Sequence, residues 1–167
     1  EIVLACDLRY ASDTPKLRMG NLEMIVGVIP GGGGTHRMLR MLGTARALEH
    51  ILEAAPLTAA EALTLGLVHR LVPEGELLAQ AQATGARLAR RAPIAVAAAK
   101  RCIYFGAHRD LGSAFDLEMA GFLAAGLGPG PGRVLQPFLD DLERLGETPH
   151  LANPAPWVEG TRVDLVS

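Results

Sequence analysis

The chain has 167 residues, which is long enough for one domain with a sizeable hydrophobic core. Hydrophobic residues make up 49% of it and charged residues 20%, a balance that excludes an intrinsically disordered chain. The formal net charge of −2 argues against nucleic acid as the main partner, because phosphate binding requires a concentrated basic face. No apolar run approaches the roughly 20 residues that span a bilayer, so we expect no membrane association.

The cysteines and histidines show no pattern of metal ligation. Cys6 and Cys102 have neither metal-binding nor redox spacing, and we expect them to be free thiols of a reducing cytoplasm. The five histidines also lack metal-ligand spacing, so we expect no metal site.

The first part of the chain predicts short elements followed by helices. The apolar run at residues 2–5 fits a buried strand or a buried helical turn equally well, and residues 7–11 look extended. Apolar residues recur at helical spacing over residues 35–42 and 44–55, with Gly43 as a break between the two helices.

A capping box then marks the start of another helix. Thr58 followed by Glu61 predicts a helix that ends at Gly66, and residues 67–72 read as a strand. Further helices are predicted over residues 76–91, 94–105, 111–127 and 134–145. The sequence GLGPGPG (residues 126–132) predicts a break between the last two. Residues 146–167 are proline-bearing and aperiodic, which is typical of an arm or a loose tail.

The segment MGNLEMIVGVIPGGGGTHR, residues 19–37, combines a carboxylate with a glycine turn. Glu23 lies a few residues before four consecutive glycines, which run into a predicted helix start at Thr35. Such glycines can adopt positive φ, and the amides entering the helix can point at a ligand oxygen or an ordered water. An acid/base group beside exposed amides is a catalytic arrangement, whereas the glycines alone would favour a flexible loop.

Two nucleotide-binding interpretations of the glycines are excluded. A phosphate-binding P-loop requires Lys and then Ser or Thr after its last glycine, and here Thr35 and His36 stand there. The dinucleotide fingerprint requires a preceding strand and a glycine at the place of His36, and Pro30 leads into the turn instead.

An ordered set of motifs resembles the crotonase superfamily, and within it the enoyl-CoA hydratases and isomerases. The motifs are Glu1-x-x-x-Ala5-Cys6-Asp7-Leu8-Arg9-x-Ala11-Ser12, Gly20-x-x-Glu23, Gly27-x-Ile29-Pro30-Gly31-x-Gly33-Gly34-Thr35-x-Arg37, Thr58-Ala59-x-Glu61-Ala62, Gly66-Leu67-Val68 and Ala92-Pro93 with Lys100. The resemblance covers residues 1–145.

This resemblance implies an α/β fold, part of a crotonase-like spiral of β-β-α units whose N-terminal units are absent. Residues 1–75 would be the C-terminal part of the spiral core, and residues 76–145 a helical region for trimer assembly, with residues 146–167 as an irregular tail. It also implies a helix at residues 1–6, an extended chain from Asp7, and a homo-oligomer that is a trimer or a dimer of trimers.

The resemblance also implies the site residues and the reaction. Glu1 and Glu23 match the two catalytic glutamates, and Gly31 the glycine whose amide holds the catalytic water. The substrate would be an acyl-CoA, with coenzyme A as part of the substrate and no separate cofactor. Hydration of a 2-enoyl thioester needs one carboxylate to take a proton from water and one to protonate C2, so we expect a hydratase.

Two alternatives stay open. An isomerase that moves the double bond from C3 to C2 needs Glu23 alone. The resemblance also places both amides of the oxyanion hole before Glu1, so we expect an upstream segment to supply them. Without such a segment the chain would be a catalytically incompetent fragment or an assembly subunit.

Overall fold

The computed structural model describes residues 1–166, which form two compact units: residues 1–82, and the chain from Ala83 onward. The described residues are mostly helical and include two short strands, in keeping with the expected α/β class. Within residues 1–166, no helix combines the length and the apolar character needed to cross a membrane.

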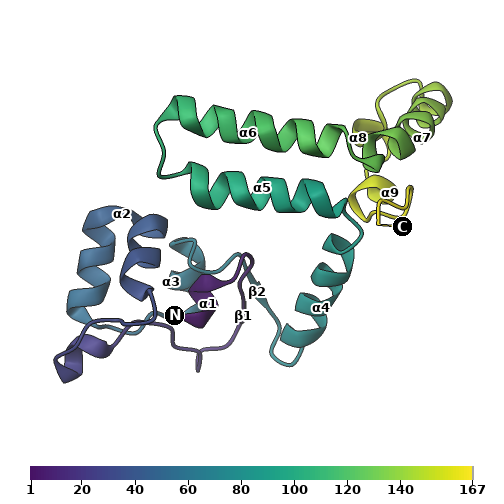
Figure 1. Ribbon diagram of the computed structural model, residues 1–167. Coiled ribbons are helices and arrows are strands. Elements are labelled where there is room, and N and C mark those ends of the chain that lie inside the picture. The colour runs from purple at the N-terminus through teal and green to yellow at the C-terminus, as the bar shows by residue number, and fades with distance from the viewer. Residues whose placement is uncertain (167) are drawn as a thin grey trace. The chain divides into compact units, whose positions relative to one another are not determined.

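The first unit contains short N-terminal elements and a long helix. In chain order it holds α1 (Ile2–Ala5), β1 (Tyr10–Ser12), the 3-10 helix η1 (Glu23–Val26), α2 (Gly34–Glu53), α3 (Ala59–Thr64) and β2 (Arg70–Val72) (Figure 1). The strands pair in parallel, with Ala11 opposite Leu71. Residues 2–5 are therefore helical, as the resemblance implied, and each strand is shorter than the extended run predicted for it.

Local signals fix two boundaries in this unit. Gly43 interrupts α2 with φ 76° and ψ 169°, so the predicted break between two helices is confirmed. The capping box of α3 is also present: the Thr58 side chain accepts from the Glu61 amide, and the Glu61 carboxylate accepts from the Thr58 amide at 2.8 Å. Each satisfies a helix-end donor that would otherwise have no partner.

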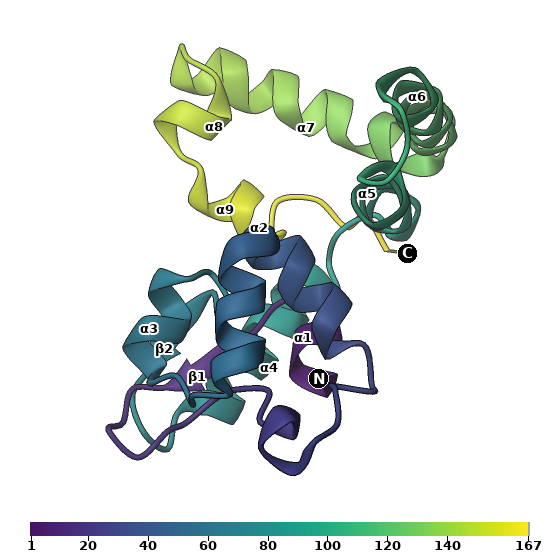
Figure 2. The ribbon, with the colours of Figure 1, turned by 90° about the vertical axis from the view of Figure 1, so that its left-hand side faces the viewer.

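A buried arginine connects the N-terminal elements to the rest of the unit. Arg9 donates from Nε to the Leu67 carbonyl and from Nη1 to the Cys6 carbonyl, both at 2.6 Å. These bonds hold the link between α1 and β1 against the chain that leads into β2. The hydrophobic core of this unit is made of Leu4, Ala11, Met38, Ala47, Ile51, Leu57, Ala62, Leu67 and Val68. Since Leu4 belongs to this core, α1 has a defined position beside the start of α2 (Figure 2).

The second unit is helical. Helix α4 (Leu77–Leu88) leads into it and is followed by α5 (Pro93–Gly106), α6 (Leu111–Gly126), α7 (Pro129–Leu145), α8 (Pro149–Ala152) and α9 (Ala155–Val158). Helices α5 and α6 lie side by side as a hairpin (Figure 1). They approach closely at Gly121, where an added Cβ would lie 3.2 Å from the Ala98 Cβ.

Helix α7 starts five residues earlier than the sequence predicted. The glycine–proline run was expected to break the chain until residue 134, but Pro129 and Pro131 lie in the first turn of α7. The first amides of a helix have no acceptor within it, so proline loses no hydrogen bond there and its fixed φ is already helical.

The C-terminal segment, expected to be irregular, instead contains α8 and α9 and is anchored on α7. The side chain of Asp141 is only 8% exposed and accepts from Arg162 Nε at 2.9 Å, Arg144 Nη2 at 3.0 Å and Trp157 Nε1 at 3.1 Å. The Trp157 ring also packs edge-on against Phe138. Trp157 thus anchors the segment within its own unit.

We expect this anchor to weaken as the pH falls. Hydrogen bonds from Arg162, Arg144 and Trp157 lower the pKa of Asp141 from 3.8 to about 2. A carboxyl with a lowered folded-state pKa contributes stability above its unfolded pKa, and this is lost as the pH falls through the folded value, here between about pH 4 and pH 2. Trp157 is the single tryptophan, so its fluorescence reports the change.

A substitution studied at neutral pH distinguishes the loss of the Asp141 anchor from general unfolding by acid. Asp141→Asn should shift the Trp157 emission to longer wavelength at pH 7, while Asp140→Asn, its exposed neighbour, should not. Identical emission spectra for Asp141→Asn and the unaltered protein would contradict the assigned role.

Candidate active site

The carboxylate of Glu1 is held by the glycine turn that precedes α2. Its Oε1 accepts hydrogen bonds from the Gly32 amide at 2.8 Å and from the Gly34 amide at 2.7 Å. Packing of α1 beside the start of α2 brings these residues together across more than thirty positions of sequence. The glycine turn is therefore an anion-binding end of a helix, and its anion is a side chain of the same chain.

The close approach of Glu1 requires glycine at these positions. A Cβ added at Gly32 would lie 2.7 Å from Glu1 Oε2, and one at Gly34 would lie 2.8 Å from Glu1 Oε1 and 2.6 Å from Asn21 Nδ2. Gly33 has φ 93°, in the left-handed region that side chains disfavour. The flexible-loop interpretation is wrong for residues 32–34. Close contacts require glycine at positions 32 and 34, and a positive φ favours it at position 33.

The hydrogen bonds keep Glu1 charged. The Gly34 amide makes the largest contribution that lowers the pKa of Glu1 below 4.5, and the Gly32 amide and the Arg37 charge act in the same direction. A carboxylate that accepts two amide hydrogen bonds is stabilised in its ionised form. Glu1 can therefore act as a proton acceptor at neutral pH.

Glu23 lies on the loop that leads into the same turn. It is the first residue of η1, and its carbonyl accepts from the Val28 amide at 3.2 Å and also from the Gly27 amide, which shapes the approach to Pro30. Its side-chain Oε2 is buried and has no hydrogen-bond partner among the described residues. Buried polar atoms in native proteins nearly always have a partner, so an unpaired carboxylate oxygen marks a place for a water or ligand group.

The third predicted site residue, Gly31, is exposed at the start of the turn. The amides seen donating to Glu1 are those of Gly32 and Gly34, one and three residues further along. The proposed role of the Gly31 amide in holding a water stays a prediction.

Glu1 also borders a cavity of about 310 Å³ within the first unit. Most of its walls are apolar side chains, among them Leu4 of α1, Leu17 and Met19 of the loop after β1, Met38 of α2, and Leu57 of the link between α2 and α3. A carboxylate at the edge of an apolar cavity can meet the polar end of a ligand whose remainder is hydrophobic.

Two supporting residues were not identified as such from the sequence. Asn21 is buried against Gly34, and Arg37 donates from Nη1 to the Gly32 carbonyl at 2.7 Å. In the sequence, Arg37 stood out only as the last residue of the glycine motif, and an arginine on a helix is equally typical of a solvated basic edge.

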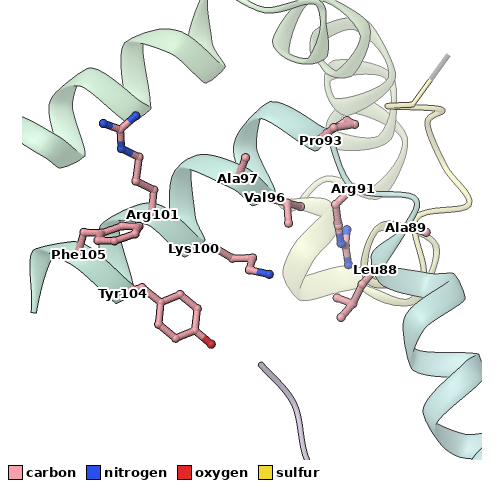
Figure 3. Close-up of a pocket in the computed structure, with 10 residues that line it drawn as sticks. All are labelled: Leu88, Ala89, Arg91, Pro93, Val96, Ala97, Lys100, Arg101, Tyr104 and Phe105. Atoms are coloured by element: carbon pink, nitrogen blue, oxygen red, sulfur yellow. The ribbon is translucent and has the colours of Figure 1, made fainter. Parts of the chain in front are cut away.

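The second unit has a larger groove of about 630 Å³ along α5. Figure 3 shows Lys100 and Tyr104 extending from one side of α5 and Arg101 from another. None of the predicted site residues lines this groove.

Comparisons with known proteins identify a family over most of the chain. A family model described as enoyl-CoA hydratase/isomerase matches residues 1–125. The chain is 39% identical over 120 residues to an enoyl-CoA isomerase/hydratase of Mycosarcoma maydis, an alignment that covers 72% of this chain and 43% of that protein. It is 36% identical over 118 residues to a short-chain-enoyl-CoA hydratase of Clostridioides difficile, covering 71% of this chain and 75% of that protein.

Solved structures are also similar. A crystal structure of an enoyl-CoA hydratase from Geobacillus kaustophilus has a TM-score of 0.78 at 33% identity and covers 83% of this chain and 52% of that chain. The crystal structure of an enoyl-CoA hydratase/isomerase from Cupriavidus metallidurans has a TM-score of 0.79 at 28% identity. The match covers 84% of this chain and 52% of that chain. The chain thus spans about half the length of these two solved structures and less than half of the Mycosarcoma maydis protein.

Proposed function

The chain belongs to the enoyl-CoA hydratase/isomerase family, and on that premise we propose that it carries the acid/base pair of an enoyl-CoA hydratase, Glu1 and Glu23. The observation that carries this proposal is an ionised carboxylate held by two amides of the glycine turn, while the loop that leads into this turn bears a second carboxylate with a buried oxygen that has no hydrogen-bond partner among the described residues. The proposed substrate is a 2-enoyl thioester of coenzyme A, with coenzyme A as part of the substrate and no further cofactor.

The proposed reaction is the syn addition of water across the C2–C3 double bond. Glu1 takes a proton from the water as its oxygen bonds to C3, and the π electrons move toward the thioester oxygen. Glu23 then gives a proton to C2, which yields the 3-hydroxyacyl thioester. Glu1 releases its proton and Glu23 regains one before the next turnover. A positioned general acid or base of this kind contributes about 10²- to 10⁴-fold to the rate.

A complete hydratase needs more than the two carboxylates of Glu1 and Glu23. The negative charge on the thioester oxygen requires preorganised amides, which we propose lie upstream of Glu1. The partial β-β-α spiral, the assembly role of residues 76–145 and a homo-oligomer, a trimer or a dimer of trimers, are proposals on the same basis. So is the amide of Gly31 as a ligand of the water.

A second candidate function is isomerisation of a 3-enoyl thioester to the 2-enoyl form. The observation that favours it is the contrast between the two carboxylates: Glu1 already accepts two amide hydrogen bonds, whereas Glu23 Oε2 has no hydrogen-bond partner among the described residues. One carboxylate that moves a proton between C2 and C4 suffices for this reaction.

The test is turnover by the purified chain beside a longer protein that begins upstream of Glu1. Both are given crotonyl-CoA, whose hydration removes the conjugated double bond, and a 3-enoyl-CoA. Hydration by either protein supports the hydratase proposal, and a shift of the double bond without hydration supports the isomerase. If neither protein changes either substrate, both enzyme proposals fail and the chain is an inactive fragment or an assembly subunit.

A further inference from the structure

The glycine turn that holds Glu1 has its own support on α2. Gly32 has no side chain and is exposed, so only the hydrogen bonds of its backbone restrict it. Its amide donates to Glu1, and its carbonyl accepts from Arg37 Nη1 at 2.7 Å. Both polar backbone groups of Gly32 are therefore hydrogen-bonded, the amide to the Glu1 carboxylate and the carbonyl to the Arg37 guanidinium.

Arg37 is well placed to fix this turn because it belongs to the regular part of α2. Its amide donates to the Gly33 carbonyl at 3.0 Å, so its backbone follows the turn directly while its side chain reaches back to Gly32. An added Cβ at Gly33 would meet this guanidinium, which shows how closely the side chain covers the turn. Four glycines in a row lose much conformational freedom on ordering, and a clamp on a rigid helix offsets part of that cost.

We propose that Arg37 is a positioning residue whose guanidinium fixes the Gly32 carbonyl and thereby aims the Gly32 and Gly34 amides at the carboxylate of Glu1. The inference rests on the proposed function insofar as Glu1 is the general base. The positive charge of Arg37 also favours the ionised form of Glu1.

The test compares Arg37→Met and Arg37→Lys with Arg40→Met, which removes a charge one turn further along α2. The first readout is the amide proton shifts of Gly32 and Gly34 in the purified chain, with Glu1→Gln as the reference for a neutral acceptor. We expect Arg37→Met to move both signals toward their Glu1→Gln positions. Arg37→Lys, which keeps the charge and one donor, should move them less, and Arg40→Met should leave them in place.

The second readout is hydration of crotonyl-CoA. Misplacement of a catalytic group by about 1 Å can lower turnover about 100-fold, so we expect Arg37→Met to lower kcat by about 10- to 100-fold with little change in KM. Unchanged amide signals in Arg37→Met would overturn the proposal. If no protein, including the unaltered one, turns over, the proposed function fails while the amide signals still decide the role of Arg37.

Discussion

Replacing Glu23 with glutamine is expected to lower the hydration rate of crotonyl-CoA by about 10²- to 10⁴-fold, the contribution of a positioned general acid. Glutamine keeps the size of the side chain and removes the proton that C2 receives. The buried, unpaired Oε2 of Glu23 makes this position sensitive, since no neighbouring described group is bonded to it that could take over the transfer. The measurement is the steady-state kcat with crotonyl-CoA, and the isomerisation rate with a 3-enoyl-CoA should fall in parallel.

The matched control is Glu49→Gln, which removes an exposed carboxylate from α2 in the same unit. It should leave both rates within about twofold, as surface substitutions away from a site generally have small effects. Equal rates for Glu23→Gln and Glu49→Gln would show that Glu23 does not transfer the proton.

Substituting Gly34 with alanine is expected to displace Glu1 and to destabilise the first unit. The new Cβ would lie 2.6 Å from Asn21 Nδ2, 2.8 Å from Glu1 Oε1 and 3.0 Å from the Pro30 Cβ. Asn21 and Pro30 are buried, so the surroundings have little room to move. Overpacking of this kind costs about 1–3 kcal/mol of the free energy of unfolding, and the loss of the Gly34 hydrogen bond should also raise the pKa of Glu1.

Denaturant unfolding measures the first effect, and a carboxyl ¹³C titration of Glu1 measures the second. Gly31→Ala serves as the control for stability, because an added Cβ there would meet no atom of residues 1–166 within 4 Å. A Gly34→Ala protein as stable as Gly31→Ala, with an unshifted Glu1 titration, would contradict the close contact described here.

Elements that depend on nearby residues could be predicted from the sequence. The break at Gly43 and the capping box of Thr58 and Glu61 each involve groups within a few positions, and both were confirmed. Strand lengths and the start of α7 were less predictable. Apolar runs continue beyond the paired residues of a strand, and prolines are tolerated in a first helical turn.

Contacts between distant residues were not predictable from pattern alone. The order of the C-terminal segment depends on Asp141, a carboxylate that periodicity places on a helix but cannot pair with Arg162 or Trp157. A segment rich in proline and without helical period resembles a loose tail until such partners are known.

In the candidate site, too, local features were predictable from the sequence and the contact between distant residues was not. The glycine turn with Glu23 nearby was visible in the sequence as a possible catalytic arrangement. Glu1 was not, because a lone glutamate at the end of a chain is ordinarily solvated, and only the family resemblance identified it. The structure adds why Glu1 and the glycine turn belong together. The Gly32 and Gly34 amides bind the Glu1 carboxylate, and any side chain on either glycine would obstruct this contact.

The central claim is that Glu1, ionised and fixed by the glycine turn, activates the water. The most direct test is the hydration rate of crotonyl-CoA by Glu1→Gln, measured beside the binding of a saturated acyl-CoA by the same variant. The account predicts a loss of about 10²- to 10⁴-fold in hydration with acyl-CoA binding unchanged. Hydration by Glu1→Gln at the rate of the unaltered protein would contradict it.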